Sequence, residues 1–248
     1  VIPAIDAAVM LTTSGSTQGP KIVVLSLANL AANARGANTR IPLGPGDRWL
    51  LSLPLYHVSG LGILLRCFLA GAAVVVPADV EGLTGQLTRH HITHVSLVAT
   101  QLFRLLRERP DGRGDTAWPG LKAILLGGGP IPIRLIQDAL ENRLPIYVSY
   151  GLTELGSQVA ASALLKSPAP ARLTAQVLPG RAVRISAGGE ILVRGPCLFQ
   201  GYWHQGRLTR PLTPDGWFAT GDLGAWDERG ELNVRGRQIG RASCRERV

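Results

Sequence analysis

Residues 12–21 read Thr12-Thr13-Ser14-Gly15-Ser16-Thr17-Gln18-Gly19-Pro20-Lys21, a stretch of hydroxyl side chains and glycines that ends in a lysine. Apolar runs at 7–11 and 22–25 flank this stretch and predict two strands with a loop between them. Backbone N–H groups, hydroxyls and a cation in such a loop can converge on phosphate oxygens. Pro20 and Ile22 exclude a Walker A loop, which needs lysine directly after glycine and then a hydroxyl residue. The stretch therefore predicts a phosphate-binding loop, with a flexible polar hairpin as the alternative.

The chain up to about residue 165 alternates between short apolar runs and amphipathic stretches. We expect strands at 48–54, 72–77, 93–98, 121–126 and 145–149, and helices at 27–34, 61–69, 80–89, 100–107 and 133–140. Ser26 is expected to cap the first of these helices. This alternation predicts an α/β fold, in which helices flank a sheet. Later runs at 182–186, 190–194 and 231–235 alternate apolar with polar residues between glycine turns and predict a small strand-rich subdomain.

These patterns suggest boundaries along the chain. We expect an α/β core over 1–165, a linker over 166–171 that contains Ser167-Pro168-Ala169-Pro170, and the strand-rich subdomain over 172–237. Residues 238–248 carry several arginines and do not continue either pattern. We expect them to be a non-native tail.

Composition limits the class of protein. The 248 residues are 46% hydrophobic and 17% charged, which is enough apolar material for a large buried core. No apolar segment reaches the ~18 residues of a membrane span, and residues 1–6 lack the pattern of a secretory signal. Cys67, Cys197 and Cys244 fit neither a metal motif nor a disulfide framework, which favours a cytoplasmic protein. The net charge of +9 comes from scattered arginines with few aromatic residues, so anionic small-molecule substrates explain it equally well, and we expect no nucleic-acid partner.

Three candidate ligand-binding segments follow predicted strands. His57 comes after strand 48–54, Gly127-Gly128-Gly129 after strand 121–126, and Tyr150-Gly151-Leu152-Thr153-Glu154 after strand 145–149. Ligands of open α/β sheets bind beyond the carboxyl ends of the strands, so these segments are expected to meet in one cleft. A structural histidine and a plain glycine turn are the alternatives.

Other charged or titratable residues stand out in apolar surroundings. Arg66 is the one charge within helix 61–69. It needs an anionic or carbonyl partner if it is buried, and otherwise extends along the surface. His90, His91 and His94 have no carboxylate or cysteine close by in sequence, so we interpret them as solvated or capping residues and not as metal ligands.

Several motifs now occur in a characteristic order: the loop at 12–21, Tyr150 to Glu154, and Gly216-Trp217-Phe218-Ala219-Thr220-Gly221-Asp222-Leu223-Gly224 followed by Gly236-Arg237. Over residues 10–237 the chain resembles the adenylate-forming acyl-CoA synthetases. Within that family, segments 51–60, 98–102 and 125–132 are most similar to the 2-succinylbenzoate-CoA ligases of menaquinone biosynthesis. The resemblance implies that a carboxylate attacks ATP with release of pyrophosphate, and that the thiol of coenzyme A then displaces AMP.

The resemblance also implies roles for particular residues. Lys21 and the loop would hold the β- and γ-phosphates of ATP, the loop residues being Thr13, Ser14, Gly15, Ser16 and Thr17. Glu154 would bind Mg²⁺, and the Thr153 hydroxyl would reach the α-phosphate, so both are catalytic candidates. Tyr150 would stack on adenine beside the backbone of Gly128, Gly129 and Gly151. Asp222 and Arg237 would bind the ribose hydroxyls, although Asp222 seen alone reads as a turn residue.

For the acid, the resemblance implies a pocket bordered by His57, which is also a catalytic candidate, and by Ser59. Arg66 would bind the second carboxylate of an aromatic dicarboxylic acid. Residues 1–165 are thus expected to be a nucleotide- and acyl-binding core.

Two departures from the family and two alternatives stay open. Gln18-Gly19 stands where the family has glycine first, and the catalytic lysine domain expected after Arg237 is absent, which predicts a weakly active or inactive fragment. A related fatty or aryl acyl-CoA synthetase would share every nucleotide residue. A non-catalytic nucleotide- or nucleic-acid-binding fragment is the second alternative, and a homo-oligomer is neither indicated nor excluded.

Overall fold

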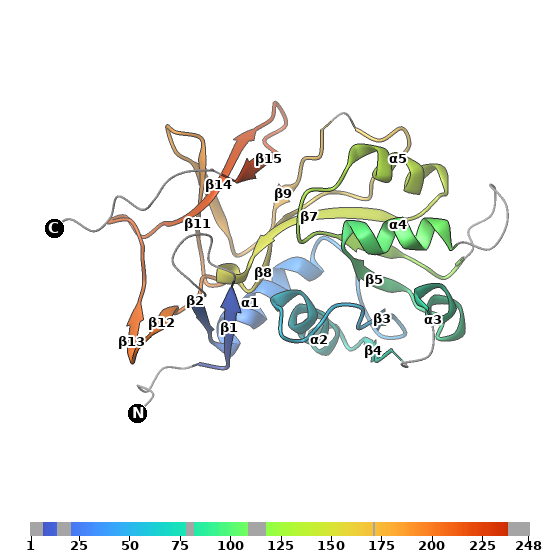
Figure 1. Ribbon diagram of the computed structural model, residues 1–248, viewed down its shortest axis with the longest axis horizontal. Helices are drawn as coiled ribbons and strands as arrows, with labels where there is room; N and C mark the ends of the chain where they lie inside the picture. The colour runs from blue at the N-terminus through green and yellow to red at the C-terminus, as the bar shows by residue number, and fades with distance from the viewer. Residues whose placement is uncertain (1–6, 14–20, 78–81, 109–117, 171, 238–248) are drawn as a thin grey trace.

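The computed structural model describes residues 7–13, 21–77, 82–108, 118–170 and 172–237, and its largest element is a seven-stranded sheet. The first strands of this sheet in spatial order are parallel, and the last ones join antiparallel (Figure 1). In that order the strands are β4 (Ala73–Val75), β3 (Arg48–Leu50), β5 (His94–Leu97), β6 (Ala123–Leu126), β7 (Ile146–Leu152), β8 (Ser157–Ala161) and β9 (Gln176–Val177).

Helices cover both faces of this sheet, as the sequence pattern predicts. They are α1 (Leu27–Asn38), α2 (Val58–Ala70), α3 (Leu83–Arg89), α4 (Ala99–Arg107) and α5 (Ile133–Glu141), with a 3₁₀ turn η1 (Thr153–Leu155) after β7. On one face, alternate residues such as Val95 and Ile124 pack with α4 and α5. On the other face, Trp49 and Leu125 pack with α2. Central strands are therefore buried on both sides, which explains their unbroken apolar runs.

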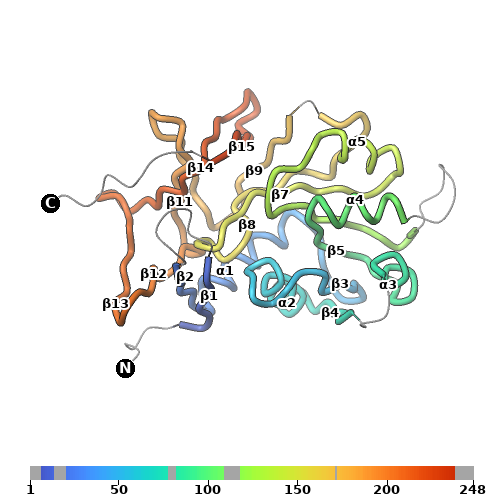
Figure 2. The backbone as a smooth tube through the Cα atoms, in the orientation of Figure 1, coloured from blue at the N-terminus to red at the C-terminus, as the bar shows by residue number. Residues whose placement is uncertain are grey.

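Two four-stranded antiparallel sheets lie beside this α/β unit (Figure 2). One contains β1 (Val9–Thr13), β2 (Lys21–Leu25), β12 (Gly201–His204) and β13 (Arg207–Thr209). The other contains β10 (Ala182–Ile185), β11 (Glu190–Arg194), β14 (Phe218–Trp226) and β15 (Leu232–Arg237). The predicted strand-rich character of the later part of the chain is confirmed, and β12, β13 and β14 are strands that the sequence pattern did not reveal.

The sheets cross the boundary that we predicted at 166–171. Strand β12 pairs with β2, with Tyr202 opposite Val23, and β9 extends the seven-stranded sheet through β8. Leu25, Phe199 and Phe218 then pack in one hydrophobic cluster. The physical reason is that the β1–β2 hairpin buries its apolar residues against the later strands, a partner far away in sequence.

The predicted cap of α1 is confirmed and ties the helix to the later segment. The Ser26 hydroxyl accepts from Asn29 N–H at 3.1 Å, while Asn29 Oδ1 accepts from Ser26 N–H at 3.0 Å. The Asn29 amide also donates to the carbonyls of Pro196 and Leu198, at 2.8 and 2.9 Å. The start of α1 thus lies fixed beside the segment that leads into β12.

Among the described residues, no helix is long and apolar enough to cross a membrane.

Candidate functional site

A cavity of about 540 Å³ lies where the parallel strands end, bounded by α2 and by the segments after β3, β5, β6 and β7. Six residues singled out from the sequence line it: His57, Ser59, Arg66, Gly128, Gly151 and Thr153. They come from three separate segments, namely α2 with its N-cap, the turn after β6, and the end of β7 with η1, and the parallel arrangement of the strands brings them to the same edge of the sheet. The expectation that the candidate segments after the strands meet in one cleft is thereby confirmed for these residues.

Arg66 is buried in the wall of this cavity, so the reading of it as a surface arginine is wrong. Its side chain is 4% exposed. Its Nε donates to Asn38 Oδ1 at 2.8 Å, its Nη1 to Gln158 Oε1 at 3.3 Å, and its guanidinium carbon lies 4.4 Å from the centre of the Trp49 ring. Its Nη2 also donates to the Ala37 carbonyl at 3.4 Å. Among the described residues, no ion pair with a carboxylate neutralises the charge of Arg66, so an anionic ligand can do so.

A second buried cation strengthens the positive field near Arg66. Arg181 is 8% exposed and donates to three backbone carbonyls, those of Gln158, Pro179 and Asn33. Burial lowers the pKa of Arg66 to about 9, and the charge of Arg181 acts in the same direction. Two buried guanidinium groups without a carboxylate partner among the described residues favour an anionic ligand.

Two other donor groups of the cavity wall lack acceptors. The indole N–H of Trp49 and the Nε2 group of Gln158 are buried without a hydrogen-bond partner among the described residues. Because Arg66 can only donate, the Gln158 amide must turn its oxygen to Arg66 and its NH₂ away. The wall around Arg66 therefore offers donors, which suits a carboxylate or carbonyl oxygen.

His57 stands at the N-terminus of α2, in the cap position, and its side chain is exposed while it lines the cavity. The ring of Tyr56 lies 4.7 Å from it. Gly60, one turn later, allows α2 to approach the preceding loop, because a Cβ there would lie 2.3 Å from the Pro54 carbonyl oxygen. This close approach places His57 at the border of the cavity.

Tyr150 and the later motif meet although 72 residues separate them. The Tyr150 hydroxyl donates to Asp222 Oδ2 at 2.7 Å, and Arg237 Nε lies 3.9 Å from Asp222 Oδ1. Asp222 lies within β14 opposite Arg237 in β15, beside a bulge, so its reading as a turn residue is wrong. Burial raises the pKa of Tyr150, and the charge of Asp222 and their hydrogen bond add to the rise.

Glu154 and Lys21 are joined through Tyr202, a residue that sequence reasoning missed. The Tyr202 hydroxyl donates to Glu154 Oε1 at 2.6 Å, and the Lys21 ammonium lies 5.1 Å from the centre of the Tyr202 ring. Burial raises the pKa of Tyr202, and the charge of Glu154 adds to the rise. The charge of Arg237 opposes the rise for both Tyr150 and Tyr202. No local motif marks Tyr202, because strand pairing alone brings it to the site.

The candidate glycines differ in what they do. Gly128 has a φ of +82°, and a Cβ there would touch Val98, while a Cβ at Gly129 would meet open space. Gly151 allows β7 and β8 to approach, since its Cβ would lie 2.2 Å from the Ser157 carbonyl oxygen. The backbone therefore explains Gly151 without a ligand.

Thr13 closes the β1–β2 hairpin by donating to the Lys21 carbonyl at 3.4 Å. The other candidates of the predicted phosphate loop, Ser14, Gly15, Ser16 and Thr17, lie outside the described residues.

The donor set fits Mg²⁺ only together with phosphate oxygens. Within the described ranges, no three His, Cys, Asp or Glu side chains lie close enough to hold a metal ion. Glu154 supplies one carboxylate, and Mg²⁺ is commonly bound by one or two carboxylates plus substrate phosphates. Glu154 therefore fits a metal that arrives with a nucleotide.

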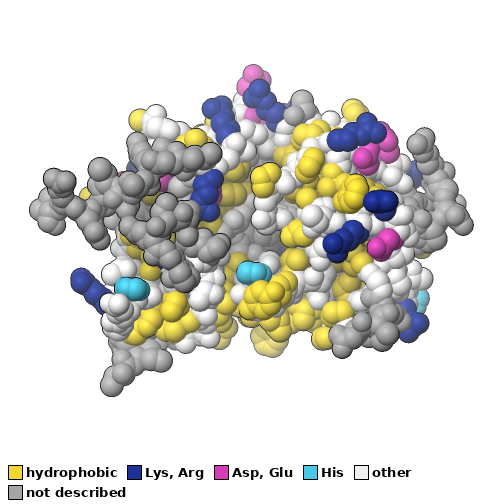
Figure 3. Space-filling model, in the orientation of Figure 1, with side chains coloured by type: hydrophobic (Ala, Val, Ile, Leu, Met, Phe, Trp, Pro, Cys, Tyr) yellow, Lys and Arg dark blue, Asp and Glu magenta, His cyan; other side chains and the backbone are white. Residues whose placement is uncertain are grey.

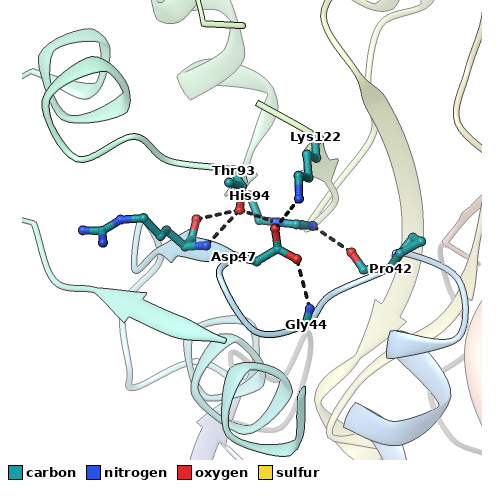
Figure 4. Close-up of polar contacts among 7 residues, drawn as sticks. Pro42, Gly44, Asp47, Thr93, His94 and Lys122 are labelled. Carbon is teal, nitrogen blue, oxygen red and sulfur yellow. Dashed lines mark hydrogen bonds and ion pairs between the residues drawn. The ribbon is translucent and has the colours of Figure 1, made fainter. Parts of the chain in front are cut away.

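The interpretation of His94 as solvated or capping is wrong. It is 1% exposed, stacks on Trp49 at 5.2 Å, and its Nε2 lies 3.0 Å from the Pro42 carbonyl (Figure 4). A carbonyl only accepts, so we assign the proton to Nε2, and Nδ1 accepts from the Thr93 hydroxyl at 2.7 Å. Sheet register explains the burial, because His94 lies directly opposite Trp49.

A second hollow, of about 520 Å³, lies between α4 and α5 and brings no candidate residue together. Hydrophobic side chains gather over these helices, and lysines and arginines are scattered over the same face (Figure 3). On the face shown, the described side chains form no continuous basic stripe of the kind typical of a nucleic-acid interface.

Comparison with known proteins agrees with this geometry. Residues 2–203 match the family described as AMP-binding enzyme. The chain belongs to the AMP-binding enzymes. A 2-succinylbenzoate–CoA ligase of Salmonella typhimurium is 41% identical over 228 residues, which cover 92% of this chain and 47% of that protein.

Solved structures of AMP-binding enzymes share this fold. The o-succinylbenzoate CoA synthetase of Bacillus subtilis, in complex with the acyl-adenylate intermediate OSB-AMP, superposes with a TM-score of 0.82 at 32% identity, covering 92% of this chain and 49% of that one. The same enzyme in complex with ATP and magnesium ion has a TM-score of 0.78 at 31% identity, with 92% and 50% covered. The chain thus spans about half the length of these relatives.

Proposed function

We propose that this chain is the nucleotide- and acid-binding part of an AMP-forming ligase that activates 2-succinylbenzoate as an acyl-adenylate for transfer to coenzyme A in menaquinone biosynthesis. The observation that carries the proposal is the buried Arg66, which has no carboxylate partner in the described part of the chain and lies in the wall of a cavity that Thr153 and Gly128 also line. An aromatic dicarboxylate needs a cation for the carboxylate that does not react. The relatives named above carry the same activity in their names.

In the proposed mechanism, the two phenol–carboxylate pairs mark the nucleotide side of the site. Tyr150 would stack on adenine, and Asp222 with Arg237 would bind the ribose hydroxyls. Lys21 and the loop residues before it would hold the β- and γ-phosphates. These donors would act on the charge that develops on the leaving pyrophosphate.

Thr153 would donate its hydroxyl to the α-phosphate, next to the cavity that holds the acid. Glu154 would hold Mg²⁺, which, when bound, neutralises phosphate charge. His57 and Ser59 would border the acid. Gln158, which also lines the cavity and was not selected from the sequence, would donate its free NH₂ beside Arg66. The acid would thus lie with one carboxylate toward Thr153 and the other toward Arg66.

A binding experiment tests the substrate. The chain is titrated calorimetrically, with ATP present, with 2-succinylbenzoate and with 4-oxo-4-phenylbutanoate, which lacks the ring carboxylate. We expect a preference of about tenfold or more for the diacid, because a hydrogen bond to a charged group contributes roughly 1.5–3 kcal/mol. Arg66→Met should abolish this preference. Arg134→Met, which removes an exposed arginine of α5, should keep it.

A fatty or aryl acyl-CoA synthetase is the rival reading. If the chain binds the monoacid or a fatty acid as tightly as the diacid, the rival is correct. If the chain binds no nucleotide at all, the proposed ligase function is wrong, whichever acid is considered as the substrate. Acid-dependent exchange of pyrophosphate into ATP, run with the same acids, provides an independent readout.

A further inference from the structure

Tyr202 links the two charged residues that the proposed function assigns to phosphate and metal. Its hydroxyl donates to Glu154 Oε1 at 2.6 Å, and the ammonium of Lys21 lies 5.1 Å from its ring centre. These residues come from β12, from the turn η1 and from the first position of β2. Three distant parts of the chain therefore meet around one phenol ring.

Sheet register explains why Lys21 reaches this ring. Strands β12 and β2 are antiparallel, and Tyr202 lies opposite Val23. Lys21 lies two residues before Val23 and so projects from the same face of the sheet. It is the diagonal neighbour of Tyr202, within reach of a long side chain.

The Tyr202 ring and the Glu154 turn are both held rigidly. Phe199 and Phe218 lie against the ring, with centroids at 4.8 and 6.5 Å. The Phe199 N–H donates to the Glu154 carbonyl at 2.8 Å, so a backbone bond joins the turn to the segment before β12. The phenol therefore meets the carboxylate from a fixed position and orients it.

The ring also keeps the cation and the carboxylate apart. Within the described part of the chain, no ion pair joins Lys21 to Glu154, and Glu154 Oε2 takes no hydrogen bond. Lys21 lies over the ring, whereas Glu154 is held by the hydroxyl. A direct ion pair between them would occupy the charges that phosphate and metal need.

We propose that Tyr202 is a positioning residue that holds Glu154 by one oxygen and separates it from Lys21. The second carboxylate oxygen then stays free for Mg²⁺, and the ammonium stays free for phosphate. This inference rests on the proposed function, because it assumes that the site binds a magnesium nucleotide.

Tyr202→Phe tests the inference, since it removes the hydroxyl and keeps the ring. ATP affinity is measured calorimetrically over a range of Mg²⁺ concentrations, and also without Mg²⁺. We expect the Mg²⁺ concentration for half-maximal enhancement to rise about tenfold, as is usual when the partner of a metal ligand is lost. ATP affinity without Mg²⁺ should stay close to the wild-type value. The control is Tyr56→Phe, which removes the hydroxyl of a tyrosine that is 71% exposed and should leave both values unchanged.

A double-mutant cycle with Glu154→Gln separates positioning from general stability. In the Glu154→Gln background, Tyr202→Phe should have no further effect on Mg²⁺ dependence, and thermal unfolding reports whether each variant is folded. Additive effects, or an unchanged Mg²⁺ dependence in Tyr202→Phe, would overturn the inference alone. A wild-type chain that binds no ATP would overturn the proposed function and this inference together.

Discussion

The hydroxyl of Tyr150 is the donor that holds Asp222 beside Arg237. Tyr150→Phe keeps the aromatic face and leaves a partly buried carboxylate oxygen without its donor. We expect the free energy of unfolding to fall by roughly 1.5–3 kcal/mol, because the lost hydrogen bond has a charged acceptor. Urea denaturation of the wild type and the variant measures this change in the free energy of unfolding. An unchanged midpoint, equal to that of Tyr56→Phe, would contradict the assignment.

Buried His94 makes stability depend on pH. Burial lowers the pKa of His94, with the charges of Arg66 and Lys122 acting in the same direction, although Pro42 and Asp47 oppose them. The unfolded chain therefore binds a proton at His94 more readily than the folded chain. Stability should decrease as the pH falls below about 6.5, the ordinary pKa of histidine, by at most ~1.4 kcal/mol per pH unit.

His94→Phe tests this prediction, because phenylalanine keeps an aromatic ring beside Trp49 and cannot titrate. The slope of the free energy of unfolding between about pH 5 and 6.5 should become shallower in this variant. His204→Gln, which removes an exposed histidine of β12, should leave the slope as it is. Equal slopes in the wild type and in both variants would show that the pKa of His94 is the same in the folded and unfolded states.

Residues next to strand ends could be predicted from sequence, whereas their partners could not. His57 and Thr153 follow apolar runs, and the α/β pattern places such positions at one edge of the sheet. Tyr202 and Gln158 carry no local signal, since each acts through a residue distant in sequence. His94 was misread because it was grouped with His90 and His91, while its burial comes from its place opposite Trp49.

At the scale of the element, α2 offers a matched pair of glycines. A Cβ at Gly60 would lie 2.3 Å from the Pro54 carbonyl oxygen, whereas a Cβ at Gly62 would lie 3.6 Å from Ser157 Oγ, an ordinary contact. We expect Gly60→Ala to lower the free energy of unfolding by about 1–3 kcal/mol through overpacking. Gly62→Ala should raise it by about 0.5–1 kcal/mol through helix propensity. Chemical denaturation of both variants shows whether the free energy of unfolding falls in one and rises in the other. Equal changes in the two variants would refute the packing argument.

The parallel strands and their helices were predicted well because burial on both faces gives them long apolar runs. Strands β12 and β13 were missed because they are short and partly exposed. Strand β14 was missed because its glycines read as turns, yet Gly224 lies in the strand, where a Cβ would crowd Ile191 at 2.8 Å. The strand propensities of individual residues predict such strands poorly, since the strands that they pair with decide whether they form.

For the whole molecule, we expect one cooperative unfolding transition. Leu25, Phe199 and Phe218 share a hydrophobic cluster, and Asn29 bonds α1 to the carbonyls of Pro196 and Leu198, so both parts of the chain are tied together. Hydrogen exchange in increasing urea should give the same opening free energy for amides of β6 and β11.

Asn29→Ala should lower that opening free energy for both strands alike, by about 2 kcal/mol, because the carbonyls of Pro196 and Leu198 lose a donor and the second of them is buried. The measurement is again hydrogen exchange, with Arg134→Ala on the exposed side of α5 as the control. If β11 opened well before β6, or if Asn29→Ala affected β11 alone, the two parts would be independent units.

Local pattern by itself determined the α/β core, the cap of α1 and the residues at the strand ends, because each depends on neighbours within a few positions. Only the tertiary structure decided which strand covers the β1–β2 hairpin, which phenol meets Glu154, and that Arg66 is buried without a carboxylate among the described residues. These features depend on contacts between segments far apart in sequence. The register of paired sheets and the packing of helices on them select such contacts, and neither is written in any short stretch of the chain.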